Sequence, residues 1–142
     1  ISFTPKDVLY SKLRPYLNKV IVPTVDGIGS TEWVVYRPNP KLIRREYLAF
    51  VMRTKWFVSL ASGTSYGARM PRANKSVLRE IKIPIPLITD PGQSLSIQEQ
   101  IVERISQFSS DVDSMQKGNA QQQRLLVQLE QSILAQAFRG EL

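Results

Sequence analysis

A long heptad pattern in the second half of the chain constrains the fold more than any other feature. From Ile101 to Ile133, one set of mostly apolar positions recurs in alternating steps of four and three residues, the spacing of a coiled-coil seam. The seam comprises Ile101, Ile105, Phe108, Val112, Met115, Asn119, Gln122, Leu126, Leu129 and Ile133. The predicted helix that carries this seam runs from about Ile97 to Arg139 and reaches roughly 60 Å at about 1.5 Å per residue. Because a small domain cannot bury that length, the helix must pack against another helix.

Polar and off-seam residues modify the pattern. Asn119 takes an a position and Gln122 the next d position, and two interpretations stay open. The pair either selects register or partner, or it marks a locally weak coiled coil with a solvent-filled middle. Further apolar residues lie off the seam, which implies more than one neighbouring helix and therefore a larger assembly. These residues are Leu125, Val127, Leu134 and Phe138.

The first part of the chain has the texture of a small α+β domain. Clusters of β-branched and aromatic residues predict strands at Val8–Tyr10, Lys19–Val22 and Glu32–Tyr36. Apolar residues at helical spacing predict one amphipathic helix from Ile43 to about Ser62, with Gly63 at its C-terminal cap. A short helix around Ser76–Arg79 and a strand at Ile81–Ile83 complete the domain.

Prolines and a capping signal divide the chain. Pro84, Pro86 and the Asp90-Pro91-Gly92 run end regular pairing, while Ser96 and Glu99 fit a capping box at a helix start. We therefore expect the α+β fold class, with a small mixed-sheet domain over residues 1–89, a linker over 90–96 and one long coiled-coil helix over 97–142.

The net charge of +7 is unevenly distributed along the chain. Residues 1–89 carry fifteen Lys and Arg against five Asp and Glu, whereas residues 90–142 carry four against seven. Such an asymmetry favours polyanion binding, because each cation placed on a phosphate releases condensed counterions. A basic but merely solvated surface is the alternative that charge alone leaves open.

The composition excludes several classes of chemistry. The chain has no cysteine and no histidine, so it can assemble neither a thiolate site nor a Ser-His-Asp triad, and it lacks the usual zinc ligands. It also lacks a Gly-rich phosphate loop, an Asn-Pro-Pro-aromatic motif and a paired-carboxylate cluster. We expect no catalysis, metal or cofactor in this chain. With no apolar run of about 20 residues, we expect a soluble cytoplasmic protein; the start at Ile1 suggests a fragment.

Several segments stand out by their residues and their order along the chain: Asp7–Lys19, Gly29–Glu32, Gly63–Arg72 with the following Lys75-Ser76-x-Leu78, Ile81–Pro86, Glu99–Val102 and the closing Gln131–Leu142. Together they resemble the target-recognition domain and distal helix of type I restriction-modification specificity subunits. The resemblance implies two recognition domains in the complete subunit, each reading half of a split DNA target, with two antiparallel helices between them. It places S-adenosylmethionine, ATP and Mg in the partner modification and restriction subunits. This chain would be the end of the second recognition domain plus the second helix.

Candidate DNA contacts lie in two basic segments. The segment from Thr64 to Arg72 combines glycines, hydroxyls and two arginines that can fork onto phosphate or guanine, although a flexible surface loop would have the same composition. The Lys12–Lys19 segment fits either DNA contact or a structural Arg-Pro-Tyr turn. Ser30–Glu32 could bond base edges, with Glu32 accepting from a cytosine amine, but we expect a satisfied turn there. The candidates are Lys12, Arg14, Tyr16, Lys19, Thr64, Ser65, Tyr66, Arg69, Arg72 and Lys75.

Two other functional classes remain open at this point. One is an assembly module whose helix joins partner subunits without direct DNA contact. The other is the recognition domain of a single-chain restriction-methylation enzyme, against which the Ala-Phe-Arg-Gly-Glu-Leu ending favours a separate subunit. In either case the apolar seam needs a partner, so we expect this chain to self-associate as a two-fold antiparallel dimer.

Overall fold

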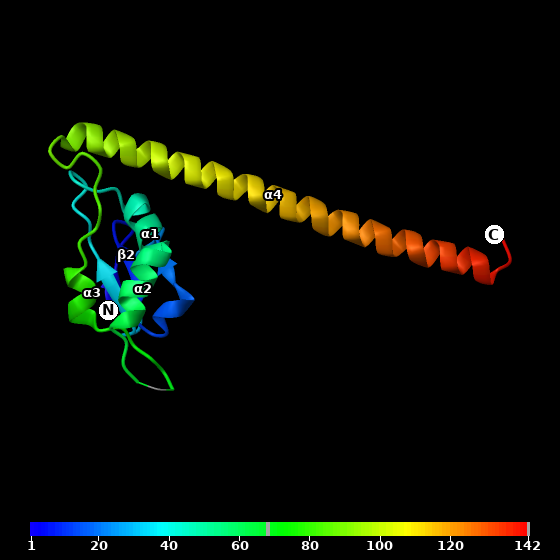
Figure 1. Ribbon diagram of the computed structural model, residues 1–142, viewed down its shortest axis with the longest axis horizontal. Coiled ribbons are helices and arrows are strands. Elements are labelled where there is room, and N and C mark those ends of the chain that lie inside the picture. The colour runs from blue at the N-terminus through cyan, green and yellow to red at the C-terminus, as the bar shows by residue number, and fades with distance from the viewer. Residues whose placement is uncertain (68, 142) are drawn as a thin grey trace. The chain divides into compact units, whose positions relative to one another are not determined.

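The computed structural model describes residues 1–67 and 69–141, which form two compact units (Figure 1). The first unit, Ile1–Val102, holds all the strands and the short helices among the described residues. The second begins at Glu103 and continues a helix that starts in the first unit. The α+β class expected from the sequence is confirmed.

A three-stranded sheet forms the centre of the first unit. Strand β2 (Val8–Ser11) lies between β3 (Val20–Ile21) and β5 (Trp33–Tyr36), with Leu9 opposite Ile21 on one side and Val35 on the other. A separate pair joins β1 (Ser2–Phe3) to β4 (Gly27–Ile28). The predicted strands at the three clusters are confirmed, but every pairing is antiparallel in the described residues, where a mixed sheet was expected. Short connections between sequential strands favour antiparallel pairing.

Two helices replace the single helix predicted from Ile43 to Ser62. Helix α1 spans Arg45–Arg53 and α2 spans Lys55–Gly63, with Thr54 in extended backbone conformation between them. The Thr54 hydroxyl donates to the carbonyl of Val51 at 2.7 Å and accepts from the amide of Phe57 at 3.3 Å. One side chain thus serves the end of one helix and caps the next, so the break leaves few backbone groups unsatisfied.

The core lies between the sheet and the helices. Val8, Tyr10 and Val34 of the sheet are fully buried, as are Met52 and Phe57, and the rings of Tyr10 and Phe57 meet edge to face at 5.1 Å. Helix α3 (Lys75–Glu80) adds buried Leu78 and is capped by Asn74, whose Oδ1 accepts from the amide of Ser76 at 2.9 Å.

The segment after α3 forms no strand. Ile81 and Ile83 pack against the core in irregular backbone, which corrects the strand predicted there. Pro84 and Pro86 follow directly, and a residue without an amide hydrogen cannot donate to a sheet. The carbonyl of Pro84 instead accepts a hydrogen bond from the Tyr47 hydroxyl at 2.9 Å.

Helix α4 spans Pro91–Phe138 and starts earlier than predicted. The Asp90 carboxylate accepts from the amide of Gln93 at 3.0 Å, and Pro91 stands where its missing amide hydrogen costs nothing. The capping box at Ser96 and Glu99 is therefore wrong, and residues 91–96 of the expected linker are helical. Glu99 forms an ion pair with Arg44 at 2.8 Å instead.

The first turns of α4 are attached to the domain by a buried amide. Gln98 is fully buried; its Oε1 accepts from the amide of Arg44 at 2.9 Å, and its Nε2 donates to the carbonyl of Leu42 at 3.0 Å. The same nitrogen donates to the hydroxyl of buried Ser94 at 3.1 Å. Ile101 and Val102 then pack against the core cluster.

Beyond Val102, the apolar residues of the predicted seam are largely exposed on α4. Phe108 and Met115 are each 70% exposed and Leu126 is 65% exposed. Apolar residues off the seam are exposed as well, Phe138 most of all. Among the described residues, no helix is long and apolar enough to cross a lipid bilayer.

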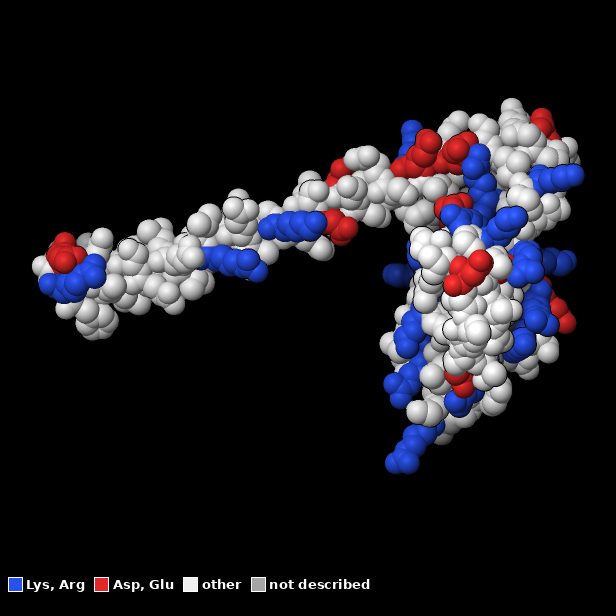
Figure 2. All heavy atoms as spheres, turned by 180° about the vertical axis from the view of Figure 1, so that it is seen from behind, with Lys and Arg blue, Asp and Glu red and all other residues white. Residues whose placement is uncertain are grey.

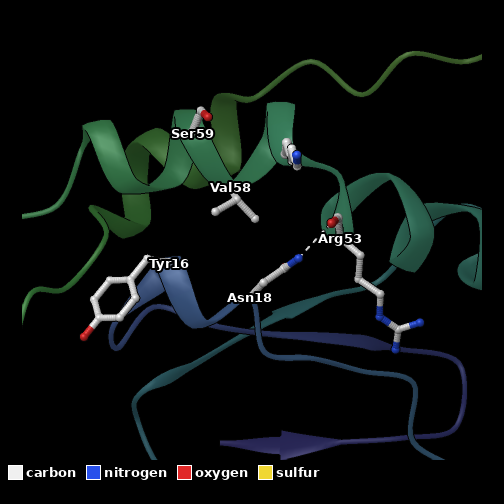
Figure 3. Close-up of a pocket in the computed structure, with 6 residues that line it drawn as sticks. Tyr16, Asn18, Arg53, Val58 and Ser59 are labelled. Carbon is white, nitrogen blue, oxygen red and sulfur yellow. Dashed lines mark hydrogen bonds between the residues drawn. The ribbon is translucent and has the colours of Figure 1, made fainter.

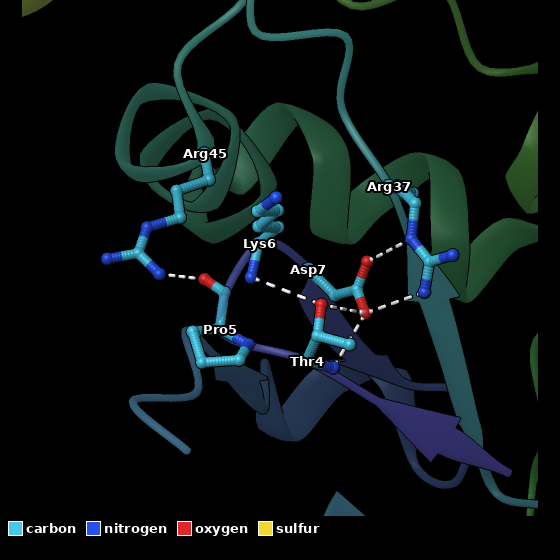
Figure 4. A network of polar contacts seen from close by, with 6 residues as sticks. All are labelled: Thr4, Pro5, Lys6, Asp7, Arg37 and Arg45. Atoms are coloured by element: carbon cyan, nitrogen blue, oxygen red, sulfur yellow. Dashed lines mark hydrogen bonds and ion pairs between the residues drawn. The ribbon is translucent and has the colours of Figure 1, made fainter. Parts of the chain in front are cut away.

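A buried carboxylate ties the start of β2 to the end of β5. Asp7 is fully buried and accepts from Arg37 through Nε at 2.7 Å and Nη2 at 3.0 Å, and from the amide of Thr4 at 2.8 Å (Figure 4). The hydrogen bonds from Arg37 outweigh the effect of burial and hold the pKa of Asp7 at about 2. The charged form is therefore strongly favoured in the folded state.

The Asp7 network predicts a specific loss of stability in acid. Since the folded pKa lies below the ordinary value, its contribution is complete above about pH 4 and disappears as the pH falls toward 2. The contribution is roughly 2 kcal/mol of unfolding free energy. We expect the unfolding free energy of Asp7→Asn, measured with urea, to depend less on pH between 4 and 2 than that of the unaltered chain. Asp26→Asn, which removes an exposed carboxylate, should keep the pH dependence of the unaltered chain. Parallel curves for the Asp7 variant and the unaltered chain would contradict this assignment.

Candidate nucleic-acid interface

Two basic segments that lie far apart in the sequence meet on one edge of the first unit. Leu13 pairs with Arg72 in an antiparallel bridge, the amide of Arg14 donates to the carbonyl of Pro71 at 2.7 Å, and the amide of Ala73 donates to the carbonyl of Lys12 at 2.8 Å. The structure therefore brings Lys12, Arg14 and Arg72 together at the base of the loop after α2. That loop projects from the end of the unit in Figure 1.

The loop itself, residues 66–72, is closed by reciprocal backbone bonds. The amide of Tyr66 donates to the carbonyl of Arg72 at 3.1 Å, and the amide of Arg72 donates to the carbonyl of Tyr66 at 2.9 Å. Gly67 has a φ of +94°, a conformation that glycine adopts without strain. Tyr66 and Met70 are 64% and 51% exposed, and Arg69 is exposed as well. The side chains of Tyr66, Arg69 and Met70 are therefore accessible to a ligand.

Two of the predicted hydroxyl contacts are engaged inside the protein. Thr64 Oγ1 donates to the carbonyl of Ala61 at 2.9 Å, and Ser65 Oγ donates to the carbonyl of Ser62 at 2.7 Å. Both groups satisfy carbonyls at the C-terminal end of α2, which intrahelical bonds leave free. Lys75, by contrast, is exposed at the first position of α3.

The guanidinium of Arg72 is held by the carboxylate of Glu32, a residue that was expected from the sequence only to form a turn. Its Nε lies 3.0 and 3.1 Å from the two carboxylate oxygens of Glu32, and its Nη1 donates to the carbonyl of Met70 at 3.3 Å. Arg72, with a smaller effect from Lys12, lowers the pKa of Glu32. The turn expected at Ser30–Glu32 does form, with the amide of Glu32 donating to Ser30 Oγ at 3.3 Å. No sequence signal linked residues forty positions apart.

Of the candidates between Arg14 and Lys19, only Tyr16 lines a hollow among the described residues. Arg14 has a φ of 52° and precedes the 3₁₀ helix η1 (Pro15–Leu17), which is the structural turn considered for this segment. Tyr16, 57% exposed, lines a hollow of about 340 Å³ beside α2 (Figure 3). Its other lining residues, which the sequence did not single out, are Asn18, Arg53, Lys55, Val58 and Ser59. Lys19 is exposed next to β3.

Lys and Arg side chains are concentrated on the domain and are few on the helix. On the face shown in Figure 2, Lys and Arg are more common than Asp and Glu on the domain, and along the helix both signs are sparse. Among the described residues, no cluster of His, Cys, Asp and Glu could hold a metal ion. The arrangement can bind an anionic, extended ligand.

A family model described as the type I restriction modification DNA specificity domain matches residues 4–123. The chain belongs to this family. It is 36% identical over 140 residues to the type I restriction enzyme EcoDI specificity subunit of Escherichia coli. The alignment covers 99% of this chain and 29% of that protein, so the chain spans less than a third of its relative's length.

The Glu32–Arg72 pair predicts local control of the loop. We expect Glu32→Gln to speed amide hydrogen exchange at Tyr66 and Arg72 severalfold, because the guanidinium that fixes the loop base loses its charged partner. Since both side chains are partly exposed, global stability should fall by less than about 1 kcal/mol. Glu80→Gln, an exposed change of equal charge, is the control. Unaltered exchange at Tyr66 would show that the backbone bonds alone hold the loop.

Proposed function

We propose that this chain is a non-catalytic DNA-recognition module that reads one half of a bipartite target within a type I restriction-modification complex in the cytoplasm. The observation that carries the proposal is the loop at residues 66–72, exposed at its tip and fixed at its base to the basic segment Lys12–Arg14. It belongs to a domain with a large excess of cations, in a chain that matches the DNA specificity family.

The DNA contacts assigned to each side chain depend on which of its polar groups are free to bind a ligand. Arg69 at the exposed tip reads base edges, since a guanidinium can donate two hydrogen bonds to guanine. Tyr66, exposed at the base of the loop, reads base edges beside it. Lys12, Arg14 and Lys75 contact phosphates, with Lys19 and Tyr16 further along the same chain segment. Arg72 positions the loop through Glu32 and adds its charge to the phosphate contacts.

The helix provides the assembly function. Its seam pairs with a second helix of the same kind, and modification and restriction subunits, which carry S-adenosylmethionine, ATP and Mg, dock on the resulting scaffold. The support is the run of exposed apolar residues on both the seam and the flanking face of α4. An assembly module without DNA contact is the second candidate function, because these exposed residues would serve it equally.

Replacement of the loop arginines tests DNA reading. In the intact complex, Arg69→Ala and Arg72→Ala should weaken binding to a target duplex and reduce the salt slope by about one for each phosphate that is no longer neutralised. Fluorescence anisotropy between 50 and 200 mM salt measures both quantities. Lys82→Ala, which removes an exposed lysine outside the two segments, is the control. If affinity and slope stay unchanged in both variants, the assembly function alone remains.

The helix seam predicts self-association of this chain. An isologous antiparallel pairing covers both seams at once, so we expect a two-fold dimer by light scattering at micromolar concentration. Ile105→Glu and Leu126→Glu should each disrupt it, because they place an unpaired charge in the seam. Ser106→Glu, next to the seam, should not. A monomeric mass for the unaltered chain, with the helix present by circular dichroism, would refute the pairing.

A further inference from the structure

A second concave surface lies in the first unit, away from the DNA loop. It is a groove of about 720 Å³, which we call the Pro38 groove. Its lining residues are Pro5, Lys6, Arg37, Pro38, Pro40, Ile43, Arg44, Arg45, Glu46 and Leu95. Figure 1 shows the connection from β5 to α1 and the first turn of α4 at the opposite end of the unit from the loop after α2.

The arginines of the groove are held in place by internal acceptors. Arg37 is fixed by Asp7, Arg44 by Glu99 and by the carbonyl of Leu95 at 3.3 Å, and Arg45 by Glu46 and the carbonyl of Pro5. Figure 4 shows Arg37 and Arg45 on either side of the Thr4–Asp7 turn. A guanidinium has five N–H donors, so each keeps hydrogens for another acceptor. Because the side chains are already ordered, a ligand loses little conformational entropy to them.

The charge of the groove specifies how many anionic groups it accepts. Lys6, Arg37, Arg44 and Arg45 are opposed by three carboxylates, those of Asp7, Glu46 and Glu99. One positive charge is left over, and the Lys6 side chain forms no ion pair in the part of the chain that the structure describes. The walls are otherwise apolar, formed by the three prolines, Ile43 and Leu95.

We propose that the Pro38 groove binds an extended segment of a partner protein in which one carboxylate is flanked by aliphatic side chains. The carboxylate lies against Lys6 and the free guanidinium hydrogens, and the aliphatic groups pack on the prolines and Leu95. Duplex DNA fits this surface poorly. Its phosphates are hydrated and regularly spaced, and its backbone offers no aliphatic side chains for the apolar walls. The proposal stands independently of DNA reading by the loop.

The test uses two synthetic hexapeptides, acetyl-Ala-Leu-Glu-Leu-Ala-Gly-amide and its Gln counterpart, titrated into the ¹⁵N-labelled 142-residue chain. We expect saturable shifts at the amides of Arg44, Arg45 and Leu95 with the Glu peptide and at least about tenfold weaker binding of the Gln peptide. Lys6→Glu should weaken binding of the Glu peptide by about tenfold as well. Lys19→Glu, which changes the net charge equally at an exposed site outside the groove, should leave it unaltered.

Three results would overturn the proposal. Equal binding of the two peptides would remove the role of the carboxylate. Equally weakened binding in Lys6→Glu and Lys19→Glu would indicate general charge attraction. Saturable shifts at the same amides with a random-sequence DNA duplex, stronger than with the Glu peptide, would make the groove a nucleic-acid surface. None of these results depends on the Arg69 loop, so a failure here is distinct from a failure of DNA recognition.

Discussion

The buried amide of Gln98 is the interaction on which the arrangement of the first unit depends. The amide of Arg44 and the carbonyl of Leu42 reach it from one distant segment, and the hydroxyl of Ser94 reaches it from one turn earlier in α4. An amide side chain buried without partners would cost several kcal/mol, so only one rotation of the first turns of α4 satisfies it. That rotation also places Ile101 and Val102 against the core and Glu99 beside Arg44. The orientation of the first turns of α4 that satisfies the amide of Gln98 is therefore also the one that buries Ile101 and Val102.

Pairing with carboxylates separates the arginines of the domain into two groups. Arg37, Arg44, Arg45 and Arg72 each have an acidic partner, and their first contribution is to hold loops and strand ends in place. The large excess of positive charge over residues 1–89 therefore overstates the charge available to a polyanion. The exposed cations outside these pairs, Arg69 and Lys75 among them, contribute most to the field that a DNA phosphate meets. A local excess of cations in a sequence is better evidence for polyanion binding once the cations that pair with carboxylates inside the protein are subtracted.

Sequence periodicity predicted the elements whose pattern is local, and it failed where a single polar side chain decides. The strands of the sheet follow from clusters of β-branched and aromatic residues, and the apolar seam of α4 follows from heptad spacing. The break at Thr54 does not, because apolar residues keep helical spacing on both sides of this one polar position and only the threonine hydroxyl makes two short helices as well satisfied as one. The start of α4 depends in the same way on Asp90, whose carboxylate accepts from the amide of Gln93. In the sequence, the capping box at Ser96 is an equally good indication of a helix start. Glu32 and Gln98 act through long-range contacts that no spacing reveals.

The two ends of α4 obey different physical constraints. Its first turns are fixed by buried hydrogen bonds to the domain, which demand one geometry and tolerate little slippage. The remainder exposes an apolar seam. The free energy that a partner gains by covering this seam is proportional to the apolar area buried and changes little with small shifts of the partner along it. Within that exposed length, Asn119 and Gln122 interrupt the apolar positions, and register selection and a locally weak coiled coil both stay open as their role. In the proposed reading of a bipartite target, the rigid end would set the register between the half-sites and the apolar length would set the span.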